Sequence, residues 1–312
     1  IHDLMKELRA LIDKYDDRVL VGETDEIAFY GTGDDELHMV FNFPLTQTER
    51  LTPAWVRENQ KTRLAQIPSI SWPCNTLGNH DSPRVYNRFG DGEHNDALAR
   101  QNLLLLLSLK GTPFLYNGEE IGMSDYFQIE LNQIRDQLGL NYYRLAKEAA
   151  GLPEEEAVKT AVQFSRDKNR TPMQWANAAN AGFSPAGVIP WLPVNPDYAQ
   201  GVNVAEQEKD PGSLLNFYRR ALRMRRENPA LISGDYSVVD EESQKILAFT
   251  RSTADQCCLV ILNMTAETVE TSLALAANEA RVVFSTCSRP AEKLNLKQLV
   301  LPPFEGLVAA LR

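Results

Sequence analysis

Short apolar runs alternate with longer amphipathic segments over the first half of the chain, and this alternation limits the fold more than any other feature. The apolar runs lie at 18–22, 37–43, 67–77 and 113–116. Segments with helical periodicity lie at 1–15, 48–66, 95–109 and 213–228. Strands that alternate with helices are typical of βα units with parallel strands. In such folds the residues at the carboxyl ends of the strands carry the chemistry.

The composition excludes two classes of partner. The chain has 312 residues, of which 43% are hydrophobic and 24% charged, as in ordinary globular proteins. A formal net charge of −10 argues against a nucleic-acid binder, which needs a basic face. No apolar run approaches the roughly 20 residues of a membrane span. The four cysteines show no metal-ligand spacing, and so few thiols predict a reducing, cytoplasmic compartment.

The polar triplet Asn79-His80-Asp81 ends the third apolar run. A His–Asp pair at a strand end suits acid–base or charge-stabilising chemistry. The alternative is a simple turn, because Asp before Ser-Pro is common in turns. Glu23 ends the first run in the same way, and it too is either catalytic or a strand end at the surface.

The second half of the chain differs in texture. Residues 124–212 are rich in Pro, Gly, Asn and Tyr, which predicts a long elaboration that serves function rather than packing. From residue 230 onward, short strand-like runs are separated by turn residues and predict an antiparallel β-domain. The predicted domains are therefore 1–229, built of βα units, and 230–312, a β-sandwich.

Four motifs occur in an order that resembles a known family. They are VGE at 21–23, LGNHDSPR at 77–84, GTPFLYNGEEIGM at 111–123 and SRDKNRTPMQW at 165–175. With them, nearly the whole chain resembles the second half of an α-glucosidase of the α-amylase superfamily (glycoside hydrolase family 13), in the oligo-1,6-glucosidase branch. RTPMQW is similar to the exo-acting enzymes rather than the endo-amylases. The resemblance implies an α/β fold, the second half of a (β/α)8 TIM barrel followed by an all-β C-terminal sandwich.

The resemblance also implies roles for individual residues. Glu23 stands where the family has its general acid/base, and Asp81 where it has the carboxylate that stabilises the transition state. His80 matches a histidine that hydrogen-bonds the same glucose. We expect Glu23 at the rim of a partly dry pocket, where burial raises a carboxyl pKa as an acid catalyst requires.

Two arginines match a substrate-contacting segment of the family. Arg166 is expected near the glucose hydroxyls, with an ion pair to Asp167 on the surface as the alternative; Arg170 is the weaker candidate. Arg84 is expected to orient the Asp81 loop by a salt bridge. For Glu120 we expect a structural role, bonding backbone at the mouth of the barrel.

One element of the family pattern is absent. The family's nucleophilic aspartate follows the fourth barrel strand, and residues 1–22 contain no GFRxD-like motif. Its aspartates, at positions 3, 13, 16 and 17, lie in a predicted helix or the turn after it. We therefore expect a partner or missing segment with the first half of the barrel and the nucleophile. No cofactor or metal is expected in this chain, and a structural calcium belongs to the missing half if the enzyme has one.

The predicted function is a retaining, exo-acting α-glucosidase that hydrolyses or transglycosylates short α-glucosides, incomplete as this chain alone. A sucrose- or trehalose-directed relative, hydrolase or isomerase, is the alternative within the class. Outside the class stand a non-catalytic scaffold and an inert fragment awaiting complementation.

Overall fold

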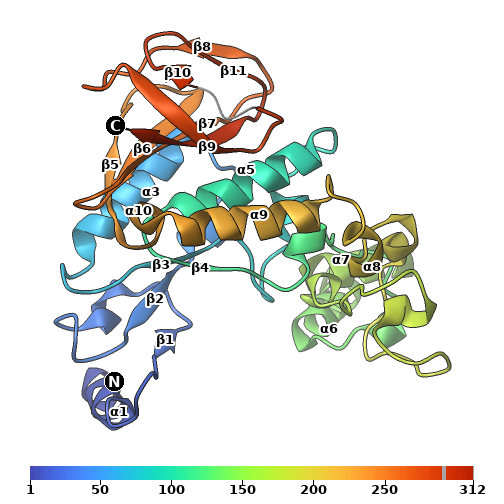
Figure 1. Ribbon diagram of the computed structural model, residues 1–312. Coiled ribbons are helices and arrows are strands. Elements are labelled where there is room, and N and C mark those ends of the chain that lie inside the picture. The colour runs from blue at the N-terminus through green and yellow to red at the C-terminus, as the bar shows by residue number, and fades with distance from the viewer. Residues whose placement is uncertain (290–292, 312) are drawn as a thin grey trace. The chain divides into compact units, whose positions relative to one another are not determined.

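The computed structural model describes residues 1–289 and 293–311, whose contacts divide the chain into two units (Figure 1). The first unit contains Ile1–Leu77, Arg100–Phe114 and Arg220–Arg312, and the second contains Gly78–Ala99 and Leu115–Arg219. The division predicted between 229 and 230 remains a prediction. Residues 290–292 and 312 of the predicted second domain lie outside the described residues.

Four short parallel strands form a sheet in the first unit, in the order β1-β2-β3-β4. They are β1 (Val21–Gly22), β2 (Met39–Asn42), β3 (Cys74–Thr76) and β4 (Thr112–Phe114). The predicted succession of parallel strands is confirmed, but the strands are shorter than their apolar runs. Only the last part of the third run pairs, because Pro68 and Pro73 lack the N–H group that a strand ladder requires.

Helices precede, separate and follow these strands along the chain. They are α1 (His2–Ile12), the 3-10 helix η1 (Ile27–Tyr30), α2 (Pro44–Gln47), α3 (Pro53–Gln66), α5 (Asn95–Ser108), α9 (Leu214–Glu227) and α10 (Pro229–Ser233). Thr52 caps α3 by accepting a hydrogen bond from Trp55 N at 3.2 Å. The leucine run of α5 is buried all round, which is the mark of a core helix. Among residues 1–289 and 293–311, no helix has the length and apolarity to cross a membrane.

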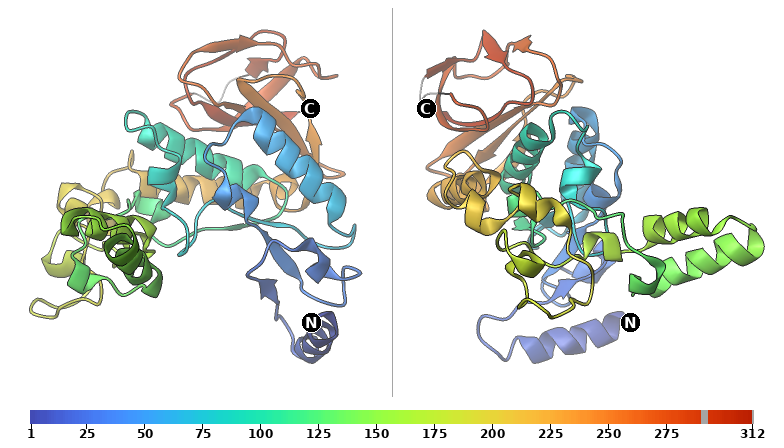
Figure 2. Two further views of the ribbon diagram at one scale, coloured as in Figure 1. Left: turned by 180° about the vertical axis from the view of Figure 1, so that it is seen from behind. Right: turned by 90° about the vertical axis from the view of Figure 1, so that its right-hand side faces the viewer.

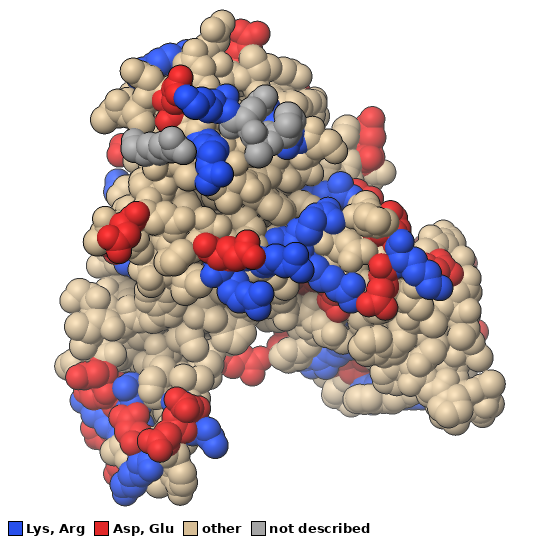
Figure 3. Space-filling view, viewed as in Figure 1, with Lys and Arg blue, Asp and Glu red and all other residues tan. Residues whose placement is uncertain are grey.

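The helix α1 has an apolar face that is only partly covered. Leu8 and Ile12 are half-buried, whereas Leu4 and Leu11 remain exposed. Acidic and basic side chains are interleaved over the rest of the helix, which lies at the lower left in Figure 3. One of these charge pairs, between Arg9 and Asp13, spans one helical turn at 2.8 Å.

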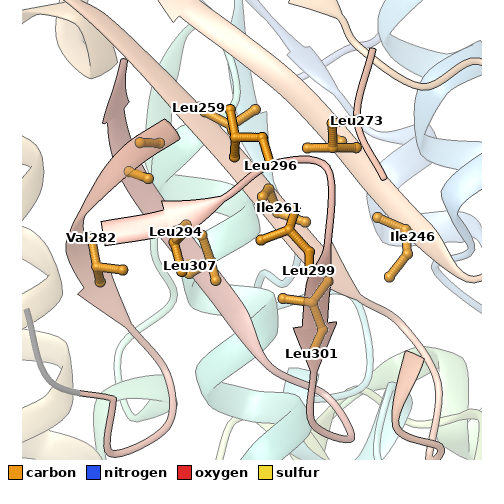
Figure 4. Packing of buried hydrophobic residues seen from close by; sticks show 13 residues of the cluster. Ile246, Leu259, Ile261, Leu273, Val282, Leu294, Leu296, Leu299, Leu301 and Leu307 are labelled. Atoms are coloured by element: carbon orange, nitrogen blue, oxygen red, sulfur yellow. The ribbon is translucent and has the colours of Figure 1, made fainter. Parts of the chain in front are cut away.

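The C-terminal part of the first unit is a two-layered β-structure. Its six-stranded antiparallel sheet has the order β10-β9-β12-β7-β6-β5, and β11 pairs with β8 in a second layer. The strands are β5 (Asp235–Val238), β6 (Ile246–Ser252), β7 (Cys257–Asn263), β8 (Val269–Thr271), β9 (Glu279–Ser285), β10 (Lys293–Asn295), β11 (Leu299–Leu301) and β12 (Gly306–Leu311). Aliphatic residues from both layers fill the space between them (Figure 4). The predicted all-β sandwich is confirmed.

Two buried arginines satisfy the last carbonyl groups of α5. Arg251 of β6 donates to the carbonyl oxygens of Ser108 and Leu109 at 2.8 and 2.7 Å. Arg225 of α9 donates to the carbonyl oxygen of Leu107. Unpaired carbonyls at a helix C-terminus carry a partial negative charge, so a guanidinium there neutralises charge and fills hydrogen bonds at once. The C-terminal sheet is therefore bonded directly to a helix of the βα part.

The second unit contains more regular structure than was predicted. Its helices are α4 (Val85–Arg88), α6 (Gln137–Arg144), α7 (Glu154–Phe164) and α8 (Val204–Gln207), with a π-helical turn at Leu145–Ala149 and short 3-10 turns between them. Helices α6 and α7 lie side by side, in green in Figure 2. The rings of Tyr142 and Phe164 stack between the two helices, with 4.1 Å between the ring centroids. The predicted elaboration over 124–212 thus contains a pair of packed helices, which was not predicted.

Candidate active site

The polar turn after β3 is held in shape by its own first residue. Asn79 Oδ1 accepts the backbone N–H of Asp81 at 3.0 Å. This local bond turns the chain sharply, so that His80 and Asp81 are exposed just beyond the buried end of the strand. His80 Nε2 lies 3.5 Å from Asp81 Oδ2, which allows an ion pair when the imidazole is protonated.

The segment 165–170 binds this turn through three side chains. Arg166 Nη1 and Arg170 Nη2 both donate to Asp81 Oδ1, the former at 3.1 Å. Arg170 Nε and Asn169 Nδ2 both donate to the carbonyl oxygen of His80 at 2.8 Å. Within the second unit, the structure thus brings together the predicted site residues His80, Asp81, Arg166 and Arg170. One Asp81 oxygen is bound by two guanidinium groups while the other faces the imidazole.

Asp136 is a member of this cluster that was not predicted. Its buried carboxylate receives Arg166 Nε and Nη2 at 2.9 Å each and Arg166 N at 2.8 Å. These bonds hold the pKa of Asp136 well below its usual range and raise that of Arg166. The alternative prediction, a surface ion pair between Arg166 and Asp167, is wrong. Asp167 is buried and accepts backbone N–H groups of Arg135 and Asp136 instead.

The segment that follows β4 contacts Arg84, which lies shortly after the Asn79-His80-Asp81 turn. The Arg84 guanidinium donates to the carbonyl oxygen of Asn117 at 3.0 Å and lies over the ring of Tyr116. Arg84 therefore orients its loop through a backbone carbonyl and an aromatic ring rather than through the predicted salt bridge. Glu120 accepts the N–H of Gly118 at 2.8 Å, the predicted kind of backbone contact.

Glu119 is a second buried carboxyl group that was not predicted. It is 7% exposed, and burial raises its pKa to about 8. Its Oε1 has no hydrogen-bond partner among the described residues and lies close against Gly78, where a Cβ would come within 2.5 Å of it. Gly78 stands directly before the Asn79-His80-Asp81 turn, so only a residue without a side chain lets the two elements approach this closely.

Glu23 follows β1 in the first unit, while His80, Asp81 and the two arginines belong to the second. The prediction that Glu23 is partly buried is wrong for this chain, since its side chain is exposed. The physical reason is its position after β1, which forms an edge of the four-stranded sheet and pairs on one side only.

The cluster around Asp81 fixes the carboxylate in one position. Two guanidinium groups donate to the same oxygen, which is a charge-assisted arrangement with a defined geometry. An exposed carboxylate surrounded by fixed cations suits the recognition of sugar hydroxyls and the stabilisation of positive charge that develops in a transition state.

Comparison with family models assigns both parts of the chain. Residues 1–234 match the family described as alpha amylase, catalytic domain. Residues 236–308 match the maltogenic amylase C-terminal domain. The catalytic-domain match covers most of the chain.

Curated relatives carry glucosidase names. The chain is 34% identical to an oligo-1,6-glucosidase of Halalkalibacterium halodurans over 84% of its own length and 49% of the relative's. It is 33% identical to a glucan 1,6-alpha-glucosidase of Streptococcus pneumoniae over 100% of its own length and 60% of the relative's. The chain therefore spans about half the length of these relatives.

Solved structures with a similar fold include a trehalulose synthase and an isomaltulose synthase. A trehalulose synthase from Pseudomonas mesoacidophila superposes with a TM-score of 0.86 at 30% identity, over 100% of this chain and 58% of that one. An isomaltulose synthase from a Klebsiella species gives a TM-score of 0.85 at 27% identity, over 100% and 58%. Variants of the trehalulose synthase have also been solved in complex with glucose and with sucrose.

Proposed function

This chain belongs to the α-amylase catalytic-domain family, and from that premise we propose that it forms part of a retaining, exo-acting α-glucosidase. The substrates are short α-glucosides, with water or a second sugar as acceptor. The names of the curated relatives support this class of reaction. The observation that carries the proposal is the exposed Asp81 carboxylate, gripped by Arg166 and Arg170 beside His80.

The proposed reaction uses three carboxylates: Glu23, Asp81 and a nucleophile. Glu23 protonates the leaving oxygen and later deprotonates the incoming water or sugar, as retention of configuration requires. Asp81 binds glucose hydroxyls and stabilises the oxocarbenium-like transition state. His80 and Arg166 donate to the same glucose and hold Asp81 in place.

The nucleophile is proposed to lie outside this chain. A nucleophilic aspartate must stand at the carboxyl end of a barrel strand. The aspartates that precede Glu23 lie in α1, at its C-terminal cap or in the turn that follows. The half-length match to the relatives supports a companion segment that supplies the first four βα units and the attacking carboxylate.

Complementation tests this division. Glucose release from p-nitrophenyl α-glucoside is measured for the chain alone and with the N-terminal half of a relative or of its own longer protein. We expect turnover only in the mixture. Turnover by the chain alone would show that the nucleophile is present here, and no turnover in a mixture that associates would sink the glucosidase proposal.

Two substitutions test the assigned roles in the assembled enzyme. Glu23→Gln should lower kcat on the order of 100-fold or more, since a general acid contributes about 10²–10⁴; Glu26→Gln, a nearby exposed glutamate, is the control. Asp81→Asn should cost a similar factor, and Asp91→Asn is its control, because Asp91 also pairs with a histidine, at 2.8 Å. Equal effects of a test variant and its control would refute that assignment.

A sucrose isomerase is the second candidate, and the solved structures of trehalulose and isomaltulose synthases support it. Product analysis separates the two. The assembled enzyme incubated with sucrose yields trehalulose or isomaltulose if it isomerises. If it is a glucosidase of the oligo-1,6 type, it releases glucose from isomaltose and leaves sucrose unchanged.

A further inference from the structure

We propose that Asp136 is a positioning residue that fixes the guanidinium plane of Arg166 against Asp81, an inference that rests on the proposed function of the Asp81 turn. Asp136 itself reaches neither Asp81 nor the substrate position. It acts through Arg166, which is the group that touches Asp81.

The geometry of the pair determines the orientation of the arginine. Asp136 Oδ2 binds Arg166 Nε and Asp136 Oδ1 binds Arg166 Nη2, both at 2.9 Å, which is the bidentate arrangement that fixes a guanidinium in one plane. The Asp136 side chain is 2% exposed and that of Arg166 is 37% exposed. The anchor is thus shielded from water and the arginine extends from it toward the surface.

Bond counting shows what the anchor leaves for the active site. A guanidinium has five N–H groups in a rigid fork. Two point at Asp136 and one, on Nη1, points at Asp81. The remaining N–H groups, on Nη1 and Nη2, are therefore held in set directions beside Asp81, where the hydroxyls of a bound glucose would meet them.

Asp136 is itself rigidly held, from two sides. It caps helix α6 by accepting Leu138 N at 3.1 Å. Its own N–H and that of Arg135 donate to Asp167 Oδ2 at 2.8 and 2.6 Å. The result is a reciprocal clasp, in which Asp136 binds residue 166 and the carboxylate of residue 167 binds the backbone of 135 and 136. These bonds fix the start of helix α6, and Asp136 at that position in turn fixes the Arg166 guanidinium that it binds.

Without the anchor, Arg166 has another arrangement available. Its Nη1 and Nη2 could both turn to Asp81, whose Oδ1 is already bound by Arg170. That would occupy the second Asp81 oxygen and remove it from the sugar. Asp136 prevents this by binding Nη2, so the second Asp81 oxygen stays available to the sugar.

The clasp offers a matched control for the experiment. Asp136→Asn keeps the shape but replaces the charged oxygen opposite Arg166 Nη2 or Nε by an amide. Asp167→Asn disturbs the same clasp at an equally buried carboxylate whose bonds go to backbone N–H groups. Both variants remove structural hydrogen bonds, but only the first releases the guanidinium of Arg166.

Two measurements are made on both variants. In the complemented enzyme, Asp136→Asn should lower kcat/KM on the order of 100-fold, the cost of a misplaced group in an active site, with Asp167→Asn losing clearly less at a similar thermal midpoint. In the chain by itself, phenylglyoxal labelling followed by mass spectrometry should show Arg166 reacting several-fold faster in Asp136→Asn. Arg170 in the same spectra serves as the internal standard. Asp136→Glu, which restores a carboxylate, should recover part of kcat/KM.

Equal losses of kcat/KM in Asp136→Asn and Asp167→Asn, together with unchanged Arg166 labelling, would overturn the inference. The labelling needs no catalytic activity. If the complemented wild-type enzyme proves inactive on α-glucosides, the proposed function fails, and the labelling alone still decides whether Asp136 fixes Arg166.

Discussion

The buried carboxyl group of Glu119 makes a specific prediction about how stability depends on pH. Burial raises its pKa from 4.5 to about 8 in the folded chain, and the charge of Glu120 adds to this while Arg84 opposes it. The unfolded chain loses the proton near its ordinary value, whereas the folded chain retains it until about pH 8. Between these values the folded state binds more protons, so its stability falls as pH rises.

The magnitude follows from the two pKa values. Each pH unit between them costs about 1.36 kcal/mol, so the total penalty approaches about 5 kcal/mol in alkali. Glu119→Gln keeps the size and removes the titration. Relative to wild type, we expect the variant to gain about 4 kcal/mol of stability between about pH 5 and about pH 9. Urea denaturation of both proteins, followed by circular dichroism across this range, measures the difference.

The neighbouring residue supplies the control. Glu120→Gln removes the adjacent carboxyl group, which is only half-buried and bound to the N–H of Gly118. A stability difference between wild type and Glu119→Gln that stays flat with pH would refute the reasoning. So would an equal gain in Glu120→Gln, because burial would then not be the cause.

Two further substitutions test the packing that supports the site and the fold. Gly78→Ala would place a Cβ 2.5 Å from Glu119 Oε1, and we expect a loss of about 1–3 kcal/mol, seen as a lower thermal midpoint, with reduced turnover because the Asp81 turn shifts. An unchanged midpoint would contradict the close approach. Arg251→Met should cost on the order of 3 kcal/mol or more in urea denaturation, because it leaves three buried carbonyl groups without a donor. A loss below about 1 kcal/mol would contradict that role.

The parts of the site that the sequence predicted are those coded by contiguous motifs. Asn79-His80-Asp81 and the segment 165–170 are each local, and a polar turn after an apolar strand is recognisable without any partner. Asp136 lies in neither motif. Its signal was only an Asp before a short amphipathic run, which predicts a helix cap, as Asp136 indeed is for Leu138 N. Its second role depends on a contact thirty residues away that no local pattern encodes.

The fold shows the same division between local and non-local information. The order of strands and helices follows from periodicity along the chain and was predicted. The helix pair α6–α7 was not predicted, because its contact is made by the small residues Gly139 and Ala161 and by the Tyr142–Phe164 stack, which do not form a clear apolar stripe in the sequence. Strand lengths were overestimated where prolines break the ladder. The burial of Glu23 was predicted from the apolar run before it, but it depends on what covers the β1 edge.

The arginine contacts at the end of α5 bear on how chains of this kind can recombine in evolution. The two family matches meet between residues 234 and 236, which suggests a natural point for exchanging C-terminal parts. Yet Arg251, on the far side of that point, completes the last turn of α5, and Arg57 of α3 donates to the carbonyl oxygens of Ser243 and Ile246. In a chimera joined at this boundary, the donor of each hydrogen bond comes from one parent and the acceptor from the other. Because the acceptors are backbone carbonyl groups, which every sequence carries, lineages that exchange this β-structure keep the contacts as long as each parent contributes its own arginine, Arg57 on one side and Arg251 on the other.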